Sequence, residues 1–249
     1  MGKLTGIIKF KGTFDGLTFY KSPDGYLVKT KSGVSKSRIM NDPAFVRTRE
    51  NLSEFSLNAK SGKALRQSIG PLLHRAKDSK LSSRMLQLMN SIKNHDGSSA
   101  RGERLVRLGM DNPEGKLLLK GFDFNLHAPL SSVLHAFYSV DLSTGILSIP
   151  DFNPQEHLSV PAGATHVSFC SAYVDLDFET GDYDSRYSPP SILLLDNSIS
   201  TLVLTPEAIP TGTGTRFHLL LIEFFQDVNG VQYSLRNGMF NVLNVVEVV

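Results

Sequence analysis

Apolar and polar residues alternate along residues 5 to 31, a pattern that predicts a three-stranded antiparallel meander. Two turn signals, Asp15-Gly16 and Ser22-Pro23-Asp24-Gly25, fall at hairpin spacing. The alternation places one set of apolar side chains on a single face: Ile8, Phe10, Leu17, Phe19, Tyr26 and Val28. It turns a set of lysines to the other face: Lys9, Lys11, Lys29 and Lys31. A ribbon this short has little core, so we expect its apolar face to pack on the following helices or on another chain.

Helical spacing replaces the alternation after Asp42, which is a predicted N-cap followed by Pro43 at the first helical position. The expected buried stripe of this helix is Phe45, Leu52, Phe55, Ala59 and Ile69. Gly70-Pro71 is expected to end it. Three further helical segments are predicted: one from near Ser82 to Asp96-Gly97, one from about Ser99 to Met110, and a last turn capped by Asn112.

Short strands separated by Pro, Gly, Asn and Asp are predicted from Gly121 onward. We place them near residues 117–124, 133–140, 145–150, 165–178, 191–195, 200–205, 216–226, 231–236 and 239–248. The clearest hairpin runs from Arg216 to Arg236 and turns at Asp227-Val228-Asn229-Gly230. The expected fold class is therefore α+β, with an N-terminal β-meander and helices followed by an antiparallel β-sandwich of immunoglobulin-like or jelly-roll type.

Charge divides the chain at Lys120, the last lysine. Residues 1–120 contain 23 Lys+Arg and 10 Asp+Glu, whereas residues 121–249 contain 3 Lys+Arg and 14 Asp+Glu. The two parts therefore carry +13 and −11, and together the stated +2. This division favours two modules, a basic one at 1–120 and an acidic sandwich at 121–249.

Several classes of protein are not indicated. One cysteine leaves no internal disulfide framework and no multi-cysteine zinc site. The N-terminal residues lack the apolar core and the cleavage site of a Sec signal peptide. The apolar runs are far shorter than the roughly 20 residues of a membrane helix. We therefore expect no membrane span and a cytoplasmic or virion-associated protein.

The strongest candidate for a metal site is the acidic run of Asp175, Asp177, Glu179, Asp182 and Asp184, because alternating oxygen ligands suit calcium. Its spacing fails the calcium-loop pattern, since Gly181 comes one place late and Arg186 stands at the twelfth position. We interpret the run as a solvated sheet face. The seven histidines, Cys170 and the Gly212-Thr213-Gly214 turn show no ligand, nucleophile or phosphate-loop pattern, so no catalytic residue, metal or cofactor is expected.

The basic part has two interpretations. Its candidate basic patch consists of Lys9, Lys11, Lys29, Lys31, Arg47 and Arg49, which could bind a phosphate backbone. No RNP, KH or zinc-finger signature accompanies it, and the acidic part would repel a polyanion. Alternatively, a chain with complementary ends favours head-to-tail contact between copies, which builds rings or open filaments.

Several motifs together resemble a family of uncharacterised bacterial proteins found mainly in Bacteroidota. They are GKLTGIIKFKGTFDGLTFY at the start, RTRENLSEF from Arg47 to Phe55, RGER from Arg101 to Arg104, PEGKLLLKGFDF from Pro113 to Phe124, and PAGATHVS from Pro161 to Ser168. The resemblance covers nearly the whole length and implies a two-module unit in a bacterial or phage-related setting. It implies no activity and transfers no catalytic or binding residue.

The leading hypothesis from the sequence is a non-enzymatic structural subunit that self-associates head to tail into a filament, tube or shell. The six apolar residues of the meander form its candidate assembly interface. The alternative is a nucleic-acid-binding protein that uses its basic N-terminal half. A carbohydrate-binding or hydrolytic sandwich is a third reading, and the absence of tryptophan speaks against it.

Overall fold

A computed structural model describes residues 2–6, 10–30 and 33–249 of the chain. The chain separates into two compact units, residues 1–49 and 50–249. The chain contains both helices and antiparallel sheets, so the α+β class is confirmed. The charge boundary after Lys120 lies inside the second unit, and the core of that unit draws residues from both sides of it.

The N-terminal unit begins with a four-stranded antiparallel sheet of order β1-β4-β3-β2. Its strands are β1 Gly2–Lys3, β2 Gly12–Phe14, β3 Leu17–Ser22 and β4 Gly25–Thr30. Asp15 and Gly16 both have positive φ, which matches the two-residue hairpin turn that the sequence predicts between β2 and β3. The meander is therefore present, and β1 adds a short fourth strand that the alternation did not indicate.

The sheet is followed by α1 Lys36–Asn41 and a 3-10 turn, η1 Pro43–Phe45. Asp42 caps the turn by accepting a hydrogen bond from the Ala44 N–H at 3.0 Å, as the sequence predicts. Helix α2, Val46–Ser68, begins in this unit and continues into the second one.

The second unit contains two antiparallel sheets and most of the helices. Its helices after α2 are α3 Gly70–Leu73, α4 Leu81–Lys93, α5 Val106–Met110, α6 Pro113–Leu119, α7 Leu130–Val133 and α8 Pro154–His157. The larger sheet contains β7 His166–Leu176, β8 Tyr183–Tyr187, β9 Ser191–Leu194, β11 Thr215–Val228, β12 Val231–Ser234 and β13 Val242–Val248. The smaller sheet has the order β10-β6-β5, formed by Ser200–Leu204, Leu147–Phe152 and Ser139–Val140. A 3-10 turn, η2 Leu235–Gly238, links β12 to β13.

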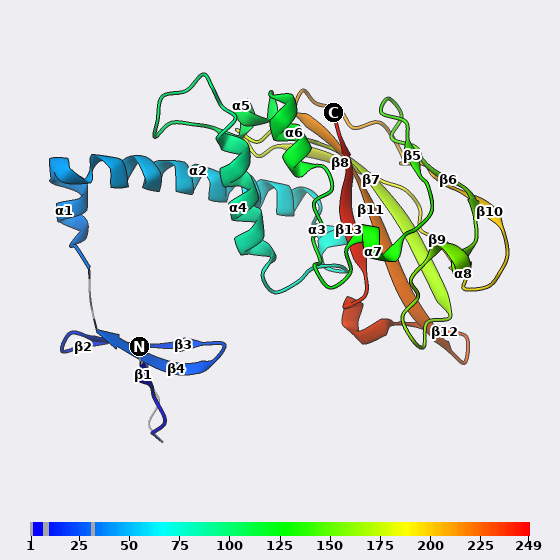
Figure 1. The fold of residues 1–249 in the computed structure, drawn as a ribbon, viewed down its shortest axis with the longest axis horizontal. Coiled ribbons are helices and arrows are strands. Elements are labelled where there is room, and N and C mark those ends of the chain that lie inside the picture. The colour runs from blue at the N-terminus through cyan, green and yellow to red at the C-terminus, as the bar shows by residue number, and fades with distance from the viewer. Residues whose placement is uncertain (1, 7–9, 31–32) are drawn as a thin grey trace. The chain divides into compact units, whose positions relative to one another are not determined.

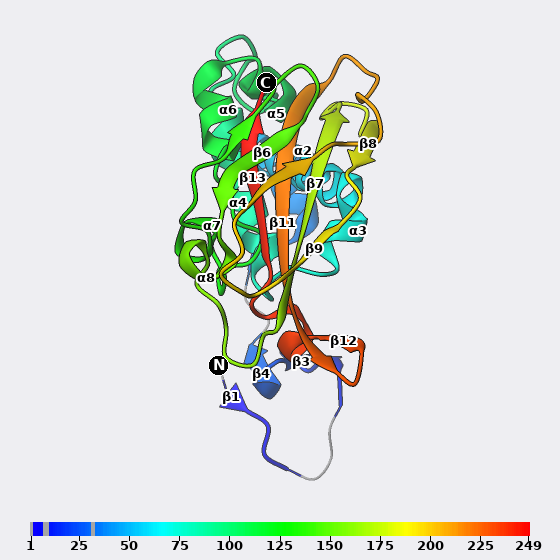
Figure 2. The ribbon, with the colours of Figure 1, turned by 90° about the vertical axis from the view of Figure 1, so that its right-hand side faces the viewer.

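The larger sheet is buried on both faces (Figures 1 and 2). Along β11, Leu219 and Leu221 enter a core beneath the helices, whereas Leu220 and Ile222 enter a second core beneath the smaller sheet. This explains why the strand reads as a continuous apolar run instead of an alternation. Within the described ranges, no helix is long and apolar enough to cross a bilayer.

Most of the stripe expected to be buried along α2 is exposed, but Ile69 just after the helix is buried as expected. Leu52 and Phe55 are 52% and 56% exposed, whereas Glu54 and Asn58 are buried. The carboxylate of Glu54 accepts hydrogen bonds from Lys93 Nζ, from the Gly102 N–H at 2.9 Å and from Arg104 Nε at 3.0 Å. Hydrophobic periodicity failed here because a fully paired carboxylate can be buried.

These contacts also explain the pKa of Glu54. Burial alone would raise it, but the hydrogen bonds from Lys93, Gly102 and Arg104 more than compensate and lower the pKa to about 2.

The helix expected from Ser99 to Met110 is mostly a loop, and only α5 is helical. Asp96, which is buried, accepts hydrogen bonds from the backbone N–H groups of Ser98, Ser99 and Leu105. These bonds satisfy donors that a helix would otherwise use, so the loop competes successfully with the helix.

The strand expected at residues 117–124 is also corrected. Asn112 caps α6 by accepting from the Glu114 N–H at 2.9 Å, and the helix continues to Leu119. Only the part after it is extended, where the Gly121 N–H donates to Val245 O at 2.7 Å and the Phe124 N–H donates to Leu243 O at 2.8 Å.

Two other segments differ from the expected strands. Most of the strand expected at 133–140 is replaced by a loop between α7 and the two-residue β5, and the strand β8 was not anticipated.

A buried histidine lies between the larger sheet and the loop before β6. His218 is 2% exposed and stacks on Tyr173 with ring centroids 4.1 Å apart. Neither of its ring nitrogens has a hydrogen-bond partner among the described residues. Burial lowers the pKa of His218 to about 4, against the attraction of Glu247 and Asp141, so the ring is neutral at pH 7.

This histidine makes stability depend on pH. Its pKa is about 4 when folded and 6.5 ordinarily, so between these values the unfolded chain binds more protons than the folded chain. The free energy of unfolding should therefore fall as the pH falls from 6.5 to 4, by up to about 3 kcal/mol from this residue. Urea unfolding across this window should show the loss in the wild type and a smaller loss in His218→Phe. His127 is exposed, so His127→Gln is the control. If the free energy of unfolding fell equally with pH in all three proteins, His218 would not be the cause.

Candidate functional site

The N-terminal sheet presents the apolar face that the alternation predicts. Phe19 pairs with Val28 across β3 and β4, and Leu17 and Tyr26 lie two residues away on the same face. The Phe10 ring lies 4.3 Å from the Phe19 ring, centroid to centroid. The register thus brings together five of the six candidate interface residues, while Ile8 lies outside the described residues.

Phe14 belongs to the same face but was not among the predicted residues. It pairs with Leu17 and is 77% exposed. The alternation did not indicate it because it stands next to the Asp15-Gly16 turn. Phe14 lies two residues from Gly12, which pairs with Phe19, so its side chain points to the same side as that of Phe19.

The N-terminal unit has no buried residue among its described positions, 2–6, 10–30 and 33–49. Half-buried side chains are confined mostly to β3 and β4. A sheet normally needs a buried apolar face for stability. This sheet therefore lacks, within its own unit, the cover that its apolar face requires.

The candidate basic patch is divided by the structure. Lys29 lies on the face opposite Phe19, with its Nζ 5.6 Å from the centre of the Tyr20 ring, and Lys11 is exposed beside β2. Lys9 and Lys31 lie outside the described residues. Arg47 is exposed, but Arg49 is half-buried and donates to the carbonyl oxygens of Ile39 at 2.7 Å and Asp42 at 3.0 Å. Arg49 thus stabilises the end of α1.

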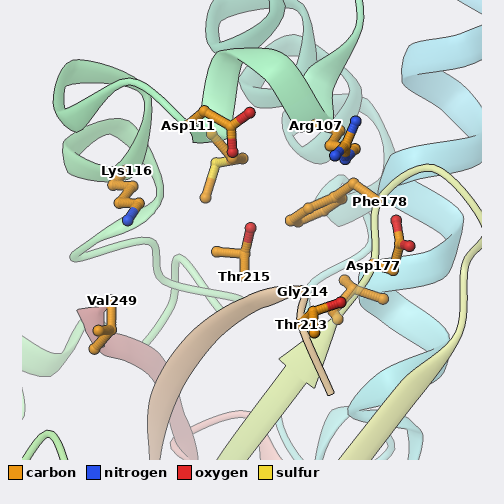
Figure 3. Close-up of a pocket in the computed structure, with 11 residues that line it drawn as sticks. Arg107, Asp111, Lys116, Asp177, Phe178, Thr213, Gly214, Thr215 and Val249 are labelled. Atoms are coloured by element: carbon orange, nitrogen blue, oxygen red, sulfur yellow. The ribbon is translucent and has the colours of Figure 1, made fainter.

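A cavity of about 150 Å³ lies in the second unit where α5 and α6 meet the ends of β7 and β11. Figure 3 shows Phe178 and Thr215 projecting toward its middle, with Arg107, Asp111 and Lys116 around them. Arg107 forms an ion pair with Glu179 at 3.3 Å, and the Asp177 carboxylate accepts the Glu179 N–H at 2.7 Å. The cavity mixes both signs of charge, so it offers no concentrated field to an ion.

The acidic run is not a uniform solvated face. Asp175 is buried, and its carboxylate accepts from the Gly214 N–H at 3.0 Å and from Arg216 Nε at 3.2 Å. Asp184 accepts from the Thr211 N–H at 2.9 Å and pairs with Arg186. Through these hydrogen bonds and ion pairs, the two side chains connect neighbouring loops and strands. Within the described residues, no group of three or more His, Cys, Asp or Glu is arranged to hold a metal ion.

Cys170 and the histidines offer little for catalysis. Burial raises the pKa of the Cys170 thiol, which donates to the carbonyl oxygen of Ser188 at 3.4 Å. His135 Nε2 lies 2.8 Å from the Ser159 hydroxyl, but in the described part of the chain no carboxylate contacts that imidazole to orient it.

The charges of the two sequence parts meet inside the second unit. Among the residues that the structure describes, three ion pairs cross the boundary at Lys120: Arg75 with Glu223 at 3.0 Å, Arg107 with Glu179 at 3.3 Å, and Lys120 with Glu247 at 2.6 Å. Some of the charge complementarity that suggested contact between copies is therefore satisfied within one chain.

Because Asp175, Asp177 and Asp184 accept hydrogen bonds from protein donors, we expect calcium to leave the protein's stability nearly unchanged. The melting temperature in millimolar calcium should match that in EDTA, for the wild type and for Asp177→Ala alike. A rise of several degrees in the wild type that Asp177→Ala abolishes would show that the run binds the ion. Glu207→Ala, which removes an exposed carboxylate outside the run, is the matched control.

The chain was compared with known proteins. No protein-family model, no curated protein and no solved structure matches it.

Proposed function

We propose that the protein is a non-enzymatic structural subunit whose N-terminal sheet docks on a second copy, so that copies join head to tail into a filament, tube or shell. The observation that carries the proposal is the absence of any buried residue at the described positions of the N-terminal unit. On the apolar face of the sheet, Phe10, Phe14 and Leu17 are exposed, and Phe19 and Val28 are half-buried between them. Contiguous exposed apolar residues of this kind are typical of protein interaction sites.

Charge supports a second copy as the partner. The described lysines of the sheet unit include Lys3, Lys11, Lys21 and Lys29, whereas residues 121–249 carry −11. An acceptor surface in the acidic part of a neighbour would complement the sheet electrostatically, and its own sheet would remain available for the next copy. In this proposal, residues 121–249 form the acidic acceptor module, a β-sandwich of immunoglobulin-like or jelly-roll type. The resemblance to bacterial proteins supports a bacterial or phage-related setting.

Substitutions on the two faces of β3 test this proposal. Phe19→Asp puts a charge in the apolar face and should shift the protein from large assemblies toward the 27.4 kDa monomer. Thr18→Asp places the same charge on the opposite face of the same strand and should leave assembly intact. Light scattering and negative-stain electron microscopy measure the particle size, while circular dichroism checks that both variants stay folded. Particles of unchanged size in Phe19→Asp would refute docking through this face.

Nucleic-acid binding is the second candidate, because Lys11, Lys29 and Arg47 are exposed and no carboxylate among the described residues lies within ion-pair distance of them. If it occurs, affinity for duplex DNA should fall linearly on a log-log salt plot, with a slope of about −0.9 for each phosphate contact.

We expect only weak binding of DNA by the intact chain, since the acidic part repels a polyanion. Fluorescence anisotropy with a labelled duplex measures this, and Lys11→Gln with Lys29→Gln should reduce the salt slope by about two. Nanomolar binding at physiological salt would favour this function over assembly.

A further inference from the structure

A second, larger hollow lies on the helical side of the second unit. It has a volume of about 690 Å³ and is open to solvent. Residues from the end of α2, from the segment between α3 and α4, and from β8 line it. Its volume lies within the roughly 300 to 1,000 Å³ that pockets for small molecules usually occupy.

Three basic side chains line this hollow, together with neutral polar and apolar ones. Arg66 comes from α2, and His74 and Lys77 come from the segment that leads from α3 to α4. The hydroxyl groups of Ser79, Ser82 and Tyr183 add hydrogen-bond donors from separate segments. Donors of this kind, converging from several elements, suit an oxyanion.

One carboxylate, Asp78, also lines the hollow, but its oxygens are occupied. They accept from the Lys80 N–H at 2.7 Å, from the Leu126 N–H at 3.1 Å and from Arg84. The Asp78 side chain is only 5% exposed. It therefore does not neutralise the hollow, whose remaining charged groups are cationic.

Arg66 gives the hollow its most distinctive feature. Its side chain is half-buried, and burial lowers its pKa. In the ranges that the structure describes, no carboxylate lies within ion-pair distance of Arg66 or of Lys77. Removing a guanidinium from water without a counterion is unfavourable, so a bound anion would compensate this cost.

We propose that this hollow binds the phosphate group of a small molecule. Arg66 donates to two phosphate oxygens, Lys77 supplies a second positive charge, and the hydroxyl of Ser82 donates to a remaining oxygen. Leu73 and Leu81, both buried, provide an apolar wall for the carbon part of the ligand. The proposal is independent of assembly through the N-terminal sheet.

The test uses the full chain and isothermal titration calorimetry at constant ionic strength. Inorganic phosphate and phenyl phosphate serve as probes, and chloride as the reference anion. Both phosphates should bind, and Arg66→Gln and Lys77→Gln should each weaken binding at least tenfold. Lys63→Gln removes one charge from the same helix outside the hollow and should bind as the wild type does.

The two probes distinguish the sources of the phosphate group. Tighter binding of phenyl phosphate indicates a phosphorylated organic ligand, and equal affinity indicates free phosphate. Lys77 is exposed, so Lys77→Gln tests the site even if Arg66→Gln reduces stability. No binding of either probe, or equal weakening by Lys63→Gln and Lys77→Gln, would overturn the proposal. Binding of a single-stranded oligonucleotide without binding of either phosphate would also overturn it.

Discussion

The second unit depends on the pairing of β7 with β11, which continues without interruption from Thr215↔Leu176 to Phe225↔His166. Nearly all of β7 and the central part of β11 are buried, so both faces of the sheet must be covered. The helices cover one face and the smaller sheet covers the other. The helices and the smaller sheet each bury one apolar face of the β7–β11 pair. Neither hydrophobic core is complete without these two strands.

The hairpin turns and the helix caps were the most predictable parts of the fold, because each rests on local chemistry. The hairpin between β11 and β12 closes at Asn229-Gly230, where both residues have positive φ. That conformation is the one that Asn-Gly favours in a two-residue turn. Likewise, Asp42 and Asn112 cap helical turns at the expected positions, since capping depends on only a few neighbouring residues.

Two of the errors, in α2 and in the acidic run, came from long-range polar contacts. The partners of Glu54 lie 39 and 50 residues away at Lys93 and Arg104, a separation that no local pattern reports. The same applies to Asp175, which looked solvated in a run of acids until Arg216, 41 residues later, was found beside it. The hollow could not be predicted from the sequence for the same reason, since Arg66 and Tyr183, which both line it, lie far apart along the chain.

Cys170 has a practical consequence for studying this protein. It is the chain's only cysteine, it is 5% exposed, and burial raises the pKa of its thiol. Thiol reagents attack thiolates that they can reach, so the native residue should react slowly while the protein is folded. A cysteine introduced at an exposed position could then carry a fluorophore or spin label selectively, without first replacing the native one.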